Sequence, residues 1–213
     1  MDKPALLICI AGPSAAGKTY FSEELKTLLA QAKISAVVIA SDDYYREHWR
    51  PDSIYGFDTV DAIDRDALIE DVQALLEGRL QLRRRYDMGT RDVSWESFNG
   101  TCDVVLLEGA FGPQLLMTHL RLDLLIYVSA SLPIRMIRRL RRDVHERQRT
   151  ILSVLRQTVM QMLPGERRFI HPLRHSADLV IREIPKGLGL AVKAIDELIK
   201  TSGAQAPRSS AQV

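Results

Sequence analysis

The residues best suited to chemistry form a glycine-rich run near the N-terminus of this 213-residue chain. The run matches the pattern G-x-x-x-x-G-K-[ST] in full. It follows an apolar stretch typical of a strand and precedes a helical pattern, which is the context that the pattern requires. Its residues are Gly12, Pro13, Ser14, Ala15, Ala16, Gly17, Lys18 and Thr19.

This run predicts a loop that binds nucleotide phosphates. Glycine near both ends lets the backbone take conformations that a side chain forbids. The N–H groups then point inward around phosphate oxygens, and the following helix adds the positive end of its dipole. We expect Lys18 to reach the β- and γ-phosphates and the Thr19 hydroxyl to bind Mg²⁺. A GTPase, a motor ATPase and a small-molecule kinase would share this motif.

Acidic residues stand at the ends of two further predicted strands. Asp42 and Asp43 follow one, and Glu108 ends a run of four apolar residues. Because the carboxyl ends of parallel strands meet at a ligand crevice, Asp42 can accept the proton of an attacking hydroxyl and lie near Mg²⁺. Glu108 suits a metal or water ligand, since hard cations prefer oxygen donors. The alternatives are that these acids cap a turn or are purely structural.

A segment rich in arginine suggests a lid over the phosphates. Guanidinium groups pair bidentately with phosphate, and a transferring phosphoryl group needs cations around it. Helical spacing of Ile137, Leu140 and Val144 predicts one apolar side for this helix, with arginines on the others. A solvated helix face and nucleic-acid binding are the alternatives. The arginines are Arg135, Arg138, Arg139, Arg141, Arg142, Arg147 and Arg149.

Alternating strand and helix patterns predict the sheet that positions these residues. Short runs rich in Val, Ile and Leu indicate parallel strands buried on both faces. They cover residues 6–11, 36–40, 104–108, 124–129 and 179–183. Helical spacing joins Phe21, Leu25 and Leu28, then Leu68, Val72 and Leu75. Further helices are expected from Arg149 to about Pro164–Gly165 and from 188 to 200, with Ile195 and Leu198 facing inward.

Three segments do not fit this alternation. Residues 44–64 are rich in aromatic and acidic side chains, residues 81–100 in arginine, glycine and polar side chains, and residues 135–149 in arginine. Because loops on a rigid sheet carry function, we expect the substrate contacts in these segments.

Composition fits one globular domain, residues 1–201, with a lid at about 135–150 and a small, polar, disordered tail at 202–213. A net charge of +2, from 29 basic and 27 acidic residues, argues against a polycation that coats nucleic acid or lipid. The two cysteines, Cys9 and Cys102, suggest buried thiols in a reducing compartment. No export signal and no apolar stretch of ~20 residues is evident, so we expect a cytoplasmic protein.

With these motifs in order, the chain resembles the uridine kinase (uridine–cytidine kinase) branch of the phosphoribulokinase/uridine kinase family from about Leu6 to Ile184. The family's S-x-D-S-F-Y-like, F-D-H-P-D-A-F-D, F-E-G and R-x-x-R-D-x-x-E-R-x-R elements fall on residues 41–45, 57–64, 107–109 and 139–149. The resemblance implies an α/β, P-loop NTPase three-layer fold. Its features are a five-stranded parallel sheet, an acceptor-side insertion and an arginine-rich lid.

The same resemblance implies individual roles. Asp42 becomes the catalytic base, and Mg²⁺ is held by Thr19, Asp42 and Glu108. The acceptor would contact Asp58 through its ribose hydroxyls, together with Tyr86, Arg139, Arg149 and Gln157. ATP would contact Lys18, Arg142 and Arg147.

The departures from the family pattern concern the acceptor more than the phosphates. Arg91 stands where the family has a histidine that reads the pyrimidine edge, and Arg84 replaces a proline. Thr59 and Val60 replace a histidine and a proline, and Lys186 falls where an ATP-side aspartate is expected. Arg91 has only donors, so it suits either pyrimidine carbonyl oxygens or an anionic acceptor.

We therefore expect an ATP- and Mg²⁺-dependent kinase of pyrimidine salvage that phosphorylates the 5′-hydroxyl of uridine or cytidine. One alternative is a kinase of the same family acting on a different, anionic hydroxyl metabolite. Another is a nucleotide-binding regulatory protein with little transfer activity. The expected partner is a small molecule, with no nucleic acid and no membrane, and the resemblance implies a homo-oligomer.

Overall fold

A five-stranded parallel sheet forms the centre of the molecule in the computed structural model, which describes residues 5–116, 119–145 and 148–204. The strand order is β2-β5-β1-β6-β7. The strands are β1 (Leu6–Ala11), β2 (Ala36–Ala40), β5 (Val104–Glu108), β6 (Leu124–Val128) and β7 (Leu179–Ile181). The prediction of these five strands is confirmed, with β6 and β7 ending slightly earlier than expected.

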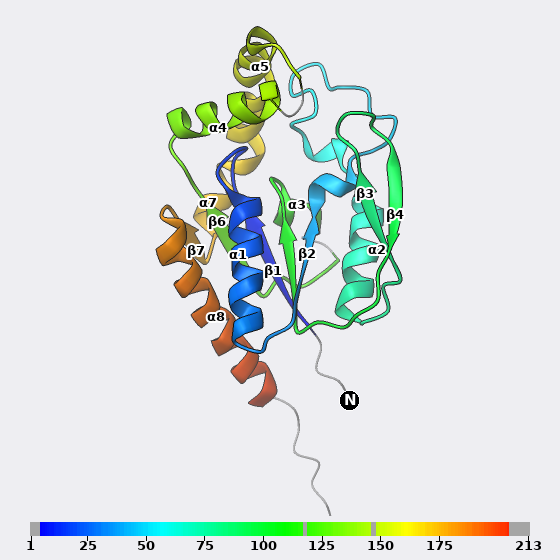
Figure 1. The fold of residues 1–213 in the computed structure, drawn as a ribbon, viewed down its shortest axis with the longest axis vertical. Helices are drawn as coiled ribbons and strands as arrows, with labels where there is room; N and C mark the ends of the chain where they lie inside the picture. The colour runs from blue at the N-terminus through cyan, green and yellow to red at the C-terminus, as the bar shows by residue number, and fades with distance from the viewer. Residues whose placement is uncertain (1–4, 117–118, 146–147, 205–213) are drawn as a thin grey trace, which may run out of the picture.

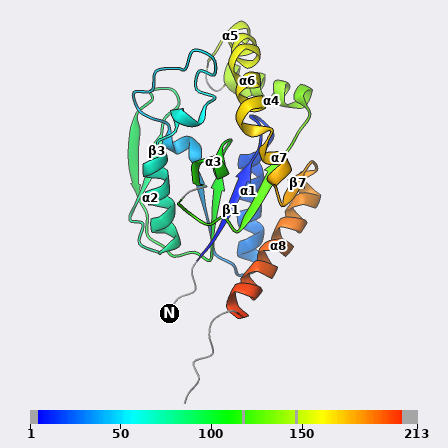
Figure 2. The same ribbon diagram turned by 180° about the vertical axis from the view of Figure 1, so that it is seen from behind.

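Helices cover both faces of the sheet, which gives three layers (Figures 1 and 2). On one face, Ile8 and Ile10 pack with α1 (Lys18–Gln31) and α8 (Ile184–Ala204). The other face packs against α2 (Arg65–Leu76), α3 (Gly112–Leu116) and α7 (Leu173–Ser176). Because each strand is buried on both faces, its sequence is apolar throughout rather than alternating.

The helical periodicities are largely confirmed. Phe21 and Leu25 are fully buried, as are Leu68 and Val72, and Ile195 faces the core. Helix α8 begins at Ile184 and continues to Ala204, so residues 202–204, expected in a disordered tail, are helical. The rest of that predicted tail lies outside the described residues.

Residues 82–97 form a β-hairpin that was not predicted from the sequence. Strands β3 (Leu82–Tyr86) and β4 (Val93–Ser97) pair antiparallel beside α2 (Figure 1). Arg84 is 9% exposed, and its Nη2 donates to the carbonyl oxygen of Tyr45 at 3.0 Å. This contact of Arg84 therefore helps to hold the hairpin to the domain.

The segment 44–64, expected as a loop, runs along the hairpin. The 3₁₀ turn η1 (Ser41–Tyr44) leads into the segment, and η2 (Val60–Ala62) lies within it. Asp43 joins the two segments, because its carboxylate accepts from the Tyr86 N–H and from Arg85 Nη1, each at 3.3 Å. Together the hairpin and this segment make the expected insertion beside the sheet.

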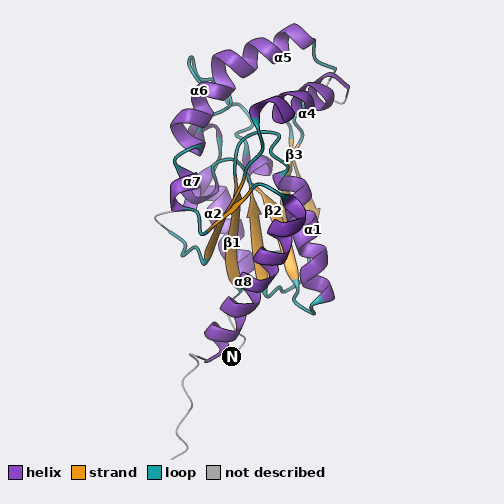
Figure 3. Ribbon diagram, turned by 90° about the vertical axis from the view of Figure 1, so that its left-hand side faces the viewer, coloured by secondary structure: helices purple, strands orange, loops and turns teal. Residues whose placement is uncertain are grey.

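Helices α4 (Leu132–His145) and α5 (Ile151–Gln157) lie above the carboxyl ends of the strands (Figure 3). The helix expected to end near Pro164–Gly165 continues through η3 (Thr158–Met162), α6 (Leu163–Gly165) and η4 (Glu166–Ile170). The prediction of a stop at the proline was wrong. Both η3 and η4 are π-helical, and their changed hydrogen-bond register accommodates a residue without an N–H.

The apolar side predicted for α4 is not the side that the helix buries. Ile137 is 67% exposed, whereas Arg135, Arg139 and Asp143 are the buried residues of the helix. The charged face turns inward because its charges pair with one another and with polar groups below, which removes most of the cost of burying them.

Among the residues that the structure describes, no helix is both long enough and apolar enough to cross a bilayer.

Two glycines in α8 offer a matched test of this packing. A Cβ at Gly187 would lie 2.3 Å from Cγ2 of Ile181, whereas a Cβ at Gly189 meets nothing within 4 Å. Gly187→Ala should therefore lower the free energy of unfolding by about 1–3 kcal/mol through overpacking. Gly189→Ala should raise it by about 0.5–1 kcal/mol through helix propensity. Urea unfolding of both variants checks this, and equal effects would contradict the placement of α8 on β7.

Candidate active site

The glycine-rich run forms the loop between β1 and α1. Gly12 and Gly17 have φ angles of 143° and 103°, which L side chains rarely adopt. A Cβ at Gly12 would also lie 2.2 Å from the carbonyl oxygen of Val128 on β6. Lys18 Nζ donates to the carbonyl oxygen of Pro13 at 3.3 Å, so the lysine folds back over the loop. The loop therefore has the geometry that the motif predicts.

Strand pairing brings the two predicted acids next to this loop. Glu108, the last residue of β5, lies opposite Ile10 of β1 and Ala40 of β2. The loop begins at Gly12, two residues beyond Ile10, and Asp42 lies two residues beyond Ala40 in η1. Glu108 thus stands between the phosphate loop and Asp42.

Burial perturbs the Glu108 carboxylate. The side chain is 7% exposed, and desolvation raises its pKa to about 7. The positive charge of Lys18 opposes the rise, and the negative charge of Asp42 adds to it. The Thr19 hydroxyl forms a hydrogen bond with Glu108. Three oxygen-bearing side chains, Thr19, Asp42 and Glu108, therefore gather beside Lys18.

Two adjoining cavities open around these residues. The loop cavity has a volume of about 260 Å³ and contains Lys18, Thr19 and Glu108 in its wall. The hairpin cavity, of about 770 Å³, lies between the β3–β4 hairpin and the lid helices. Both cavities are lined by Ser14, Asp42, Tyr45, Asp58 and Arg142. Asp42 therefore faces both spaces.

Aromatic rings form one wall of the hairpin cavity. The Tyr45 and Tyr86 rings lie 5.7 Å apart, and the Arg91 guanidinium carbon lies 4.9 Å from the centre of the Phe57 ring. Both Phe57 and Arg91 line the cavity. An aromatic wall with a cation above one ring suits a flat ligand or one that carries a negative group.

Asp58 is a half-buried acid of this cavity. Desolvation raises its pKa to about 6, although the positive charge of Arg139 opposes the shift. Gln157, Arg139 and Arg149 enclose the same space from the lid.

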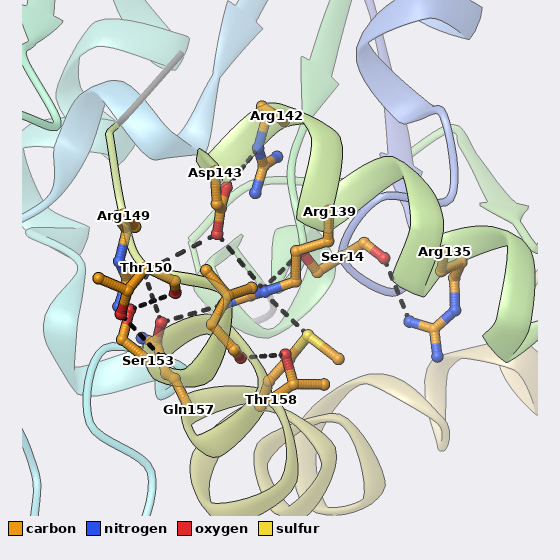
Figure 4. Close-up of polar contacts among 12 residues, drawn as sticks. Ser14, Arg135, Arg139, Arg142, Asp143, Arg149, Thr150, Ser153, Gln157 and Thr158 are labelled. Carbon is orange, nitrogen blue, oxygen red and sulfur yellow. Dashed lines mark hydrogen bonds and ion pairs between the residues drawn. The ribbon is translucent and has the colours of Figure 1, made fainter. Parts of the chain in front are cut away.

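A single carboxylate organises the lid (Figure 4). Asp143 is fully buried and lies 2.9 Å from Arg142 Nε, 3.6 Å from Arg139 Nε and 3.8 Å from Arg149 Nη1. Gln157 Oε1 accepts from Arg139 Nη2 at 3.1 Å and from Arg149 Nη1 at 2.6 Å. The arginines are thereby held with their charges directed toward the two cavities.

The structure brings most of the predicted site residues together. Gly12, Pro13 and Ala16 shape the loop without lining either cavity, and Arg147 lies outside the described residues. All other predicted residues line one cavity or both.

Two aromatic residues at the site, Tyr45 and Phe57, had no predicted role, and Arg138 was predicted only as part of the lid. Tyr45 and Phe57 line the hairpin cavity, and Arg138 Nη1 donates to the Ala16 carbonyl oxygen at 3.2 Å. Tyr45 and Phe57 stand within three residues of Asp42 and Asp58, so their proximity in sequence was the available signal. Asp143 lies within the arginine segment, directly after Arg142, and no role was predicted for it.

The oxygen donors beside the loop fit Mg²⁺. A hard cation of this kind is usually bound by one or two carboxylates together with phosphate oxygens and water. Within the described ranges, no three His, Cys, Asp or Glu side chains lie close enough to hold a metal by themselves. Thr19, Asp42 and Glu108 would therefore hold the cation only together with nucleotide phosphates, to which it would supply charge neutralisation.

Comparison with known proteins gives a consistent assignment. The profile of the "Phosphoribulokinase / Uridine kinase family" matches residues 7–188. A protein of Clostridium botulinum (strain Langeland), "Uridine kinase", is 30% identical over 188 residues, covering 86% of this chain and 90% of its own. "Uridine-cytidine kinase-like 1" of Mus musculus is 32% identical over 209 residues. That match covers 93% of this chain but only 36% of the mouse protein.

A solved structure shares the fold. A Bacillus stearothermophilus protein described as "a Possible Uridine Kinase" superimposes with a TM-score of 0.61 at 19% identity. The match covers 85% of this chain and 90% of that protein. At this identity the likeness concerns the fold alone.

The raised pKa of Glu108 predicts a pH dependence of stability. Its pKa is about 7 in the folded chain and lower when unfolded, so the folded state binds more protons between those values. The contribution of protonated Glu108 to the free energy of unfolding is fully present below the unfolded pKa and is lost as the pH rises through about 7. In EDTA and without nucleotide, unfolding of wild type between pH 5 and 8 should show this loss. In Glu108→Gln, the decrease in the free energy of unfolding between pH 5 and 8 should be smaller by about 1–3 kcal/mol. An unchanged pH slope in the variant would contradict it.

Proposed function

The chain belongs to the phosphoribulokinase/uridine kinase family, and we propose that it transfers the γ-phosphoryl group of ATP to the 5′-hydroxyl of uridine or cytidine. One observation carries the proposal. Asp42 lines both the cavity beside the phosphate loop and the larger cavity beside the hairpin. A carboxylate at that junction is in reach of a hydroxyl on one side and a terminal phosphate on the other.

On the donor side, the loop N–H groups and Lys18 bind the phosphates of ATP. Thr19, Asp42 and Glu108 would hold Mg²⁺, which would supply charge neutralisation to the phosphates. Glu108 must ionise to do so. Burial raises its pKa to about 7, and a cation bound beside it would lower that pKa and favour the charged form. Asp42 orients the acceptor hydroxyl and accepts its proton as the oxygen attacks the γ-phosphorus in line.

The lid stabilises charge that develops during transfer. Arg142 lines both cavities, so its guanidinium is placed to contact the transferring group. Arg139 and Arg149 stand on the acceptor side, held by Asp143 and Gln157. We propose an ATP contact for Arg147 as well, on the basis of the lid motif.

On the acceptor side, Asp58 and the aromatic wall suit a nucleoside. A carboxylate accepts two hydroxyl donors, as a ribose diol provides. The rings of Tyr45, Phe57 and Tyr86 offer a face for a flat base.

A second candidate acceptor is a small hydroxyl compound that carries a negative charge. Arg91 lies over Phe57, and four arginines, Arg91, Arg139, Arg142 and Arg149, line the hairpin cavity. A carboxylate or phosphate group would pair with such guanidinium forks. Arg91 is therefore the residue that separates the two candidates.

An acceptor screen tests the proposal directly. Purified protein with MgATP should phosphorylate uridine and cytidine at the 5′-position, measured by ADP release and product mass. Asp42→Asn should lower kcat roughly 10²–10⁴-fold, because the general base is lost, while the Kd for ATP changes little. Glu23→Gln, an exposed carboxylate on α1, serves as the control and should behave like wild type.

Arg91→His distinguishes the two acceptor classes in the same screen. Activity on uridine should rise in this variant, whereas activity on glycerate or a sugar phosphate should fall. If wild type leaves uridine and cytidine unchanged but phosphorylates an anionic hydroxyl compound, the second candidate replaces the first. Tight ATP binding with no acceptor among ribonucleosides, pantothenate, glycerate and sugar phosphates would contradict both.

A further inference from the structure

A buried ion pair holds one residue of the phosphate loop on both sides of its backbone. Glu166 Oε1 accepts from the Ser14 N–H at 3.0 Å, and Arg135 Nη1 donates to the Ser14 carbonyl oxygen at 3.2 Å. The two side chains also bond each other at 2.6 Å. Their side chains are 1% and 6% exposed. The loop is therefore fixed by side chains that reach it from elsewhere in the chain.

One of these side chains comes from the lid helix α4 and the other from the helical segment that follows the lid. Arg135 lies in the first turn of α4, and Glu166 begins η4. Two further arginines of α4 contact the loop: Arg139 Nη1 donates to Ser14 Oγ at 3.2 Å (Figure 4), and Arg138 donates to Ala16. Burying a pair of charges rarely adds net stability compared with apolar side chains of similar size. A role in fixing the loop accounts for the pair better than stability does.

The residue before Glu166 contacts the acceptor side. A Cβ on Gly165 would lie 2.4 Å from the carbonyl oxygen of Asp58 and 3.1 Å from its Cβ. The backbone of Gly165 is ordinary right-handed helix, with φ −61°, so the glycine is needed for close approach and not for its backbone freedom. One helical turn therefore touches the phosphate loop through Glu166 and the segment of Asp58 through Gly165.

We propose that the Gly165–Glu166 turn is a positioning element that aligns the two substrates. Glu166, together with Arg135, sets the phosphate loop for ATP, and Gly165 sets Asp58 for the acceptor. This inference rests on the proposed kinase function. It assigns neither residue a direct contact with the reacting atoms.

Substitutions at Glu166 and at Gly165 test the ATP-side and the acceptor-side part of this role separately. In Arg135→Met/Glu166→Met, apolar side chains replace the ion pair, and both bonds to Ser14 are removed without an unpaired buried charge. We expect the double variant to keep a wild-type melting temperature or higher. Its Kd for MgATP should rise at least tenfold, while the KM for uridine stays within twofold. Gly165→Ala should show the reverse, with the KM for uridine raised and the Kd for MgATP retained.

Arg167→Gln is the control, because Arg167 is exposed on the same turn, and it should match wild type in both measurements. A folded double variant with the wild-type Kd for MgATP overturns the role of Glu166. Gly165→Ala that raises both constants equally overturns the division between the two residues. If the double variant does not fold, Glu166→Ala, which removes the acceptor of the Ser14 N–H, is measured instead, and an unchanged Kd for MgATP overturns the proposal.

The Kd for MgATP is measured without acceptor, so the two hypotheses fail separately. Wild type that does not bind MgATP contradicts the proposed function and this inference with it. If wild type binds MgATP and phosphorylates an acceptor, and the variants match it in the Kd for MgATP and the KM for uridine, only this inference is contradicted.

Discussion

The parallel pairing of β5 between β1 and β2 is the constraint on which the site depends. Both neighbours place a residue opposite Glu108, Ile10 from one side and Ala40 from the other. The chain then leaves β1 as the phosphate loop and leaves β2 as the turn that carries Asp42. Because main-chain hydrogen bonds fix this register, the phosphate loop, Glu108 and Asp42 meet at one edge of the sheet.

Electrostatic compensation determines how the lid sits on that edge. Asp143 gives three guanidinium groups a shared buried partner, and Glu166 pairs with Arg135 against the loop backbone. Each arginine is thus prepositioned around the space where phosphate charge is expected. Such preorganised cations lose little on reorganisation when an anion arrives, which is the general basis of electrostatic catalysis.

Much of the sheet could be predicted from the sequence, because strands buried on both faces have a pattern set by local composition. The P-loop and the acids at strand ends followed from the same reasoning. The buried side of α4 could not be predicted from the spacing of Ile137, because the buried side carries charges that pair only after folding. The hairpin was missed because Arg84 is buried through contacts with Tyr45 and Asp64, far away in sequence. Roles of Asp58, Tyr86 and Gln157 came from family resemblance and not from periodicity.

The central claim is that Asp42 faces a nucleotide and an acceptor that bind at the same time in adjoining cavities. Affinity for a bisubstrate analogue, in which a polyphosphate chain joins adenosine to the 5′-oxygen of uridine, tests it most directly. The account predicts that the analogue binds at least ten times more tightly than ADP and competes with both ATP and uridine. An analogue that binds no better than ADP, or competes with ATP alone, would contradict the account.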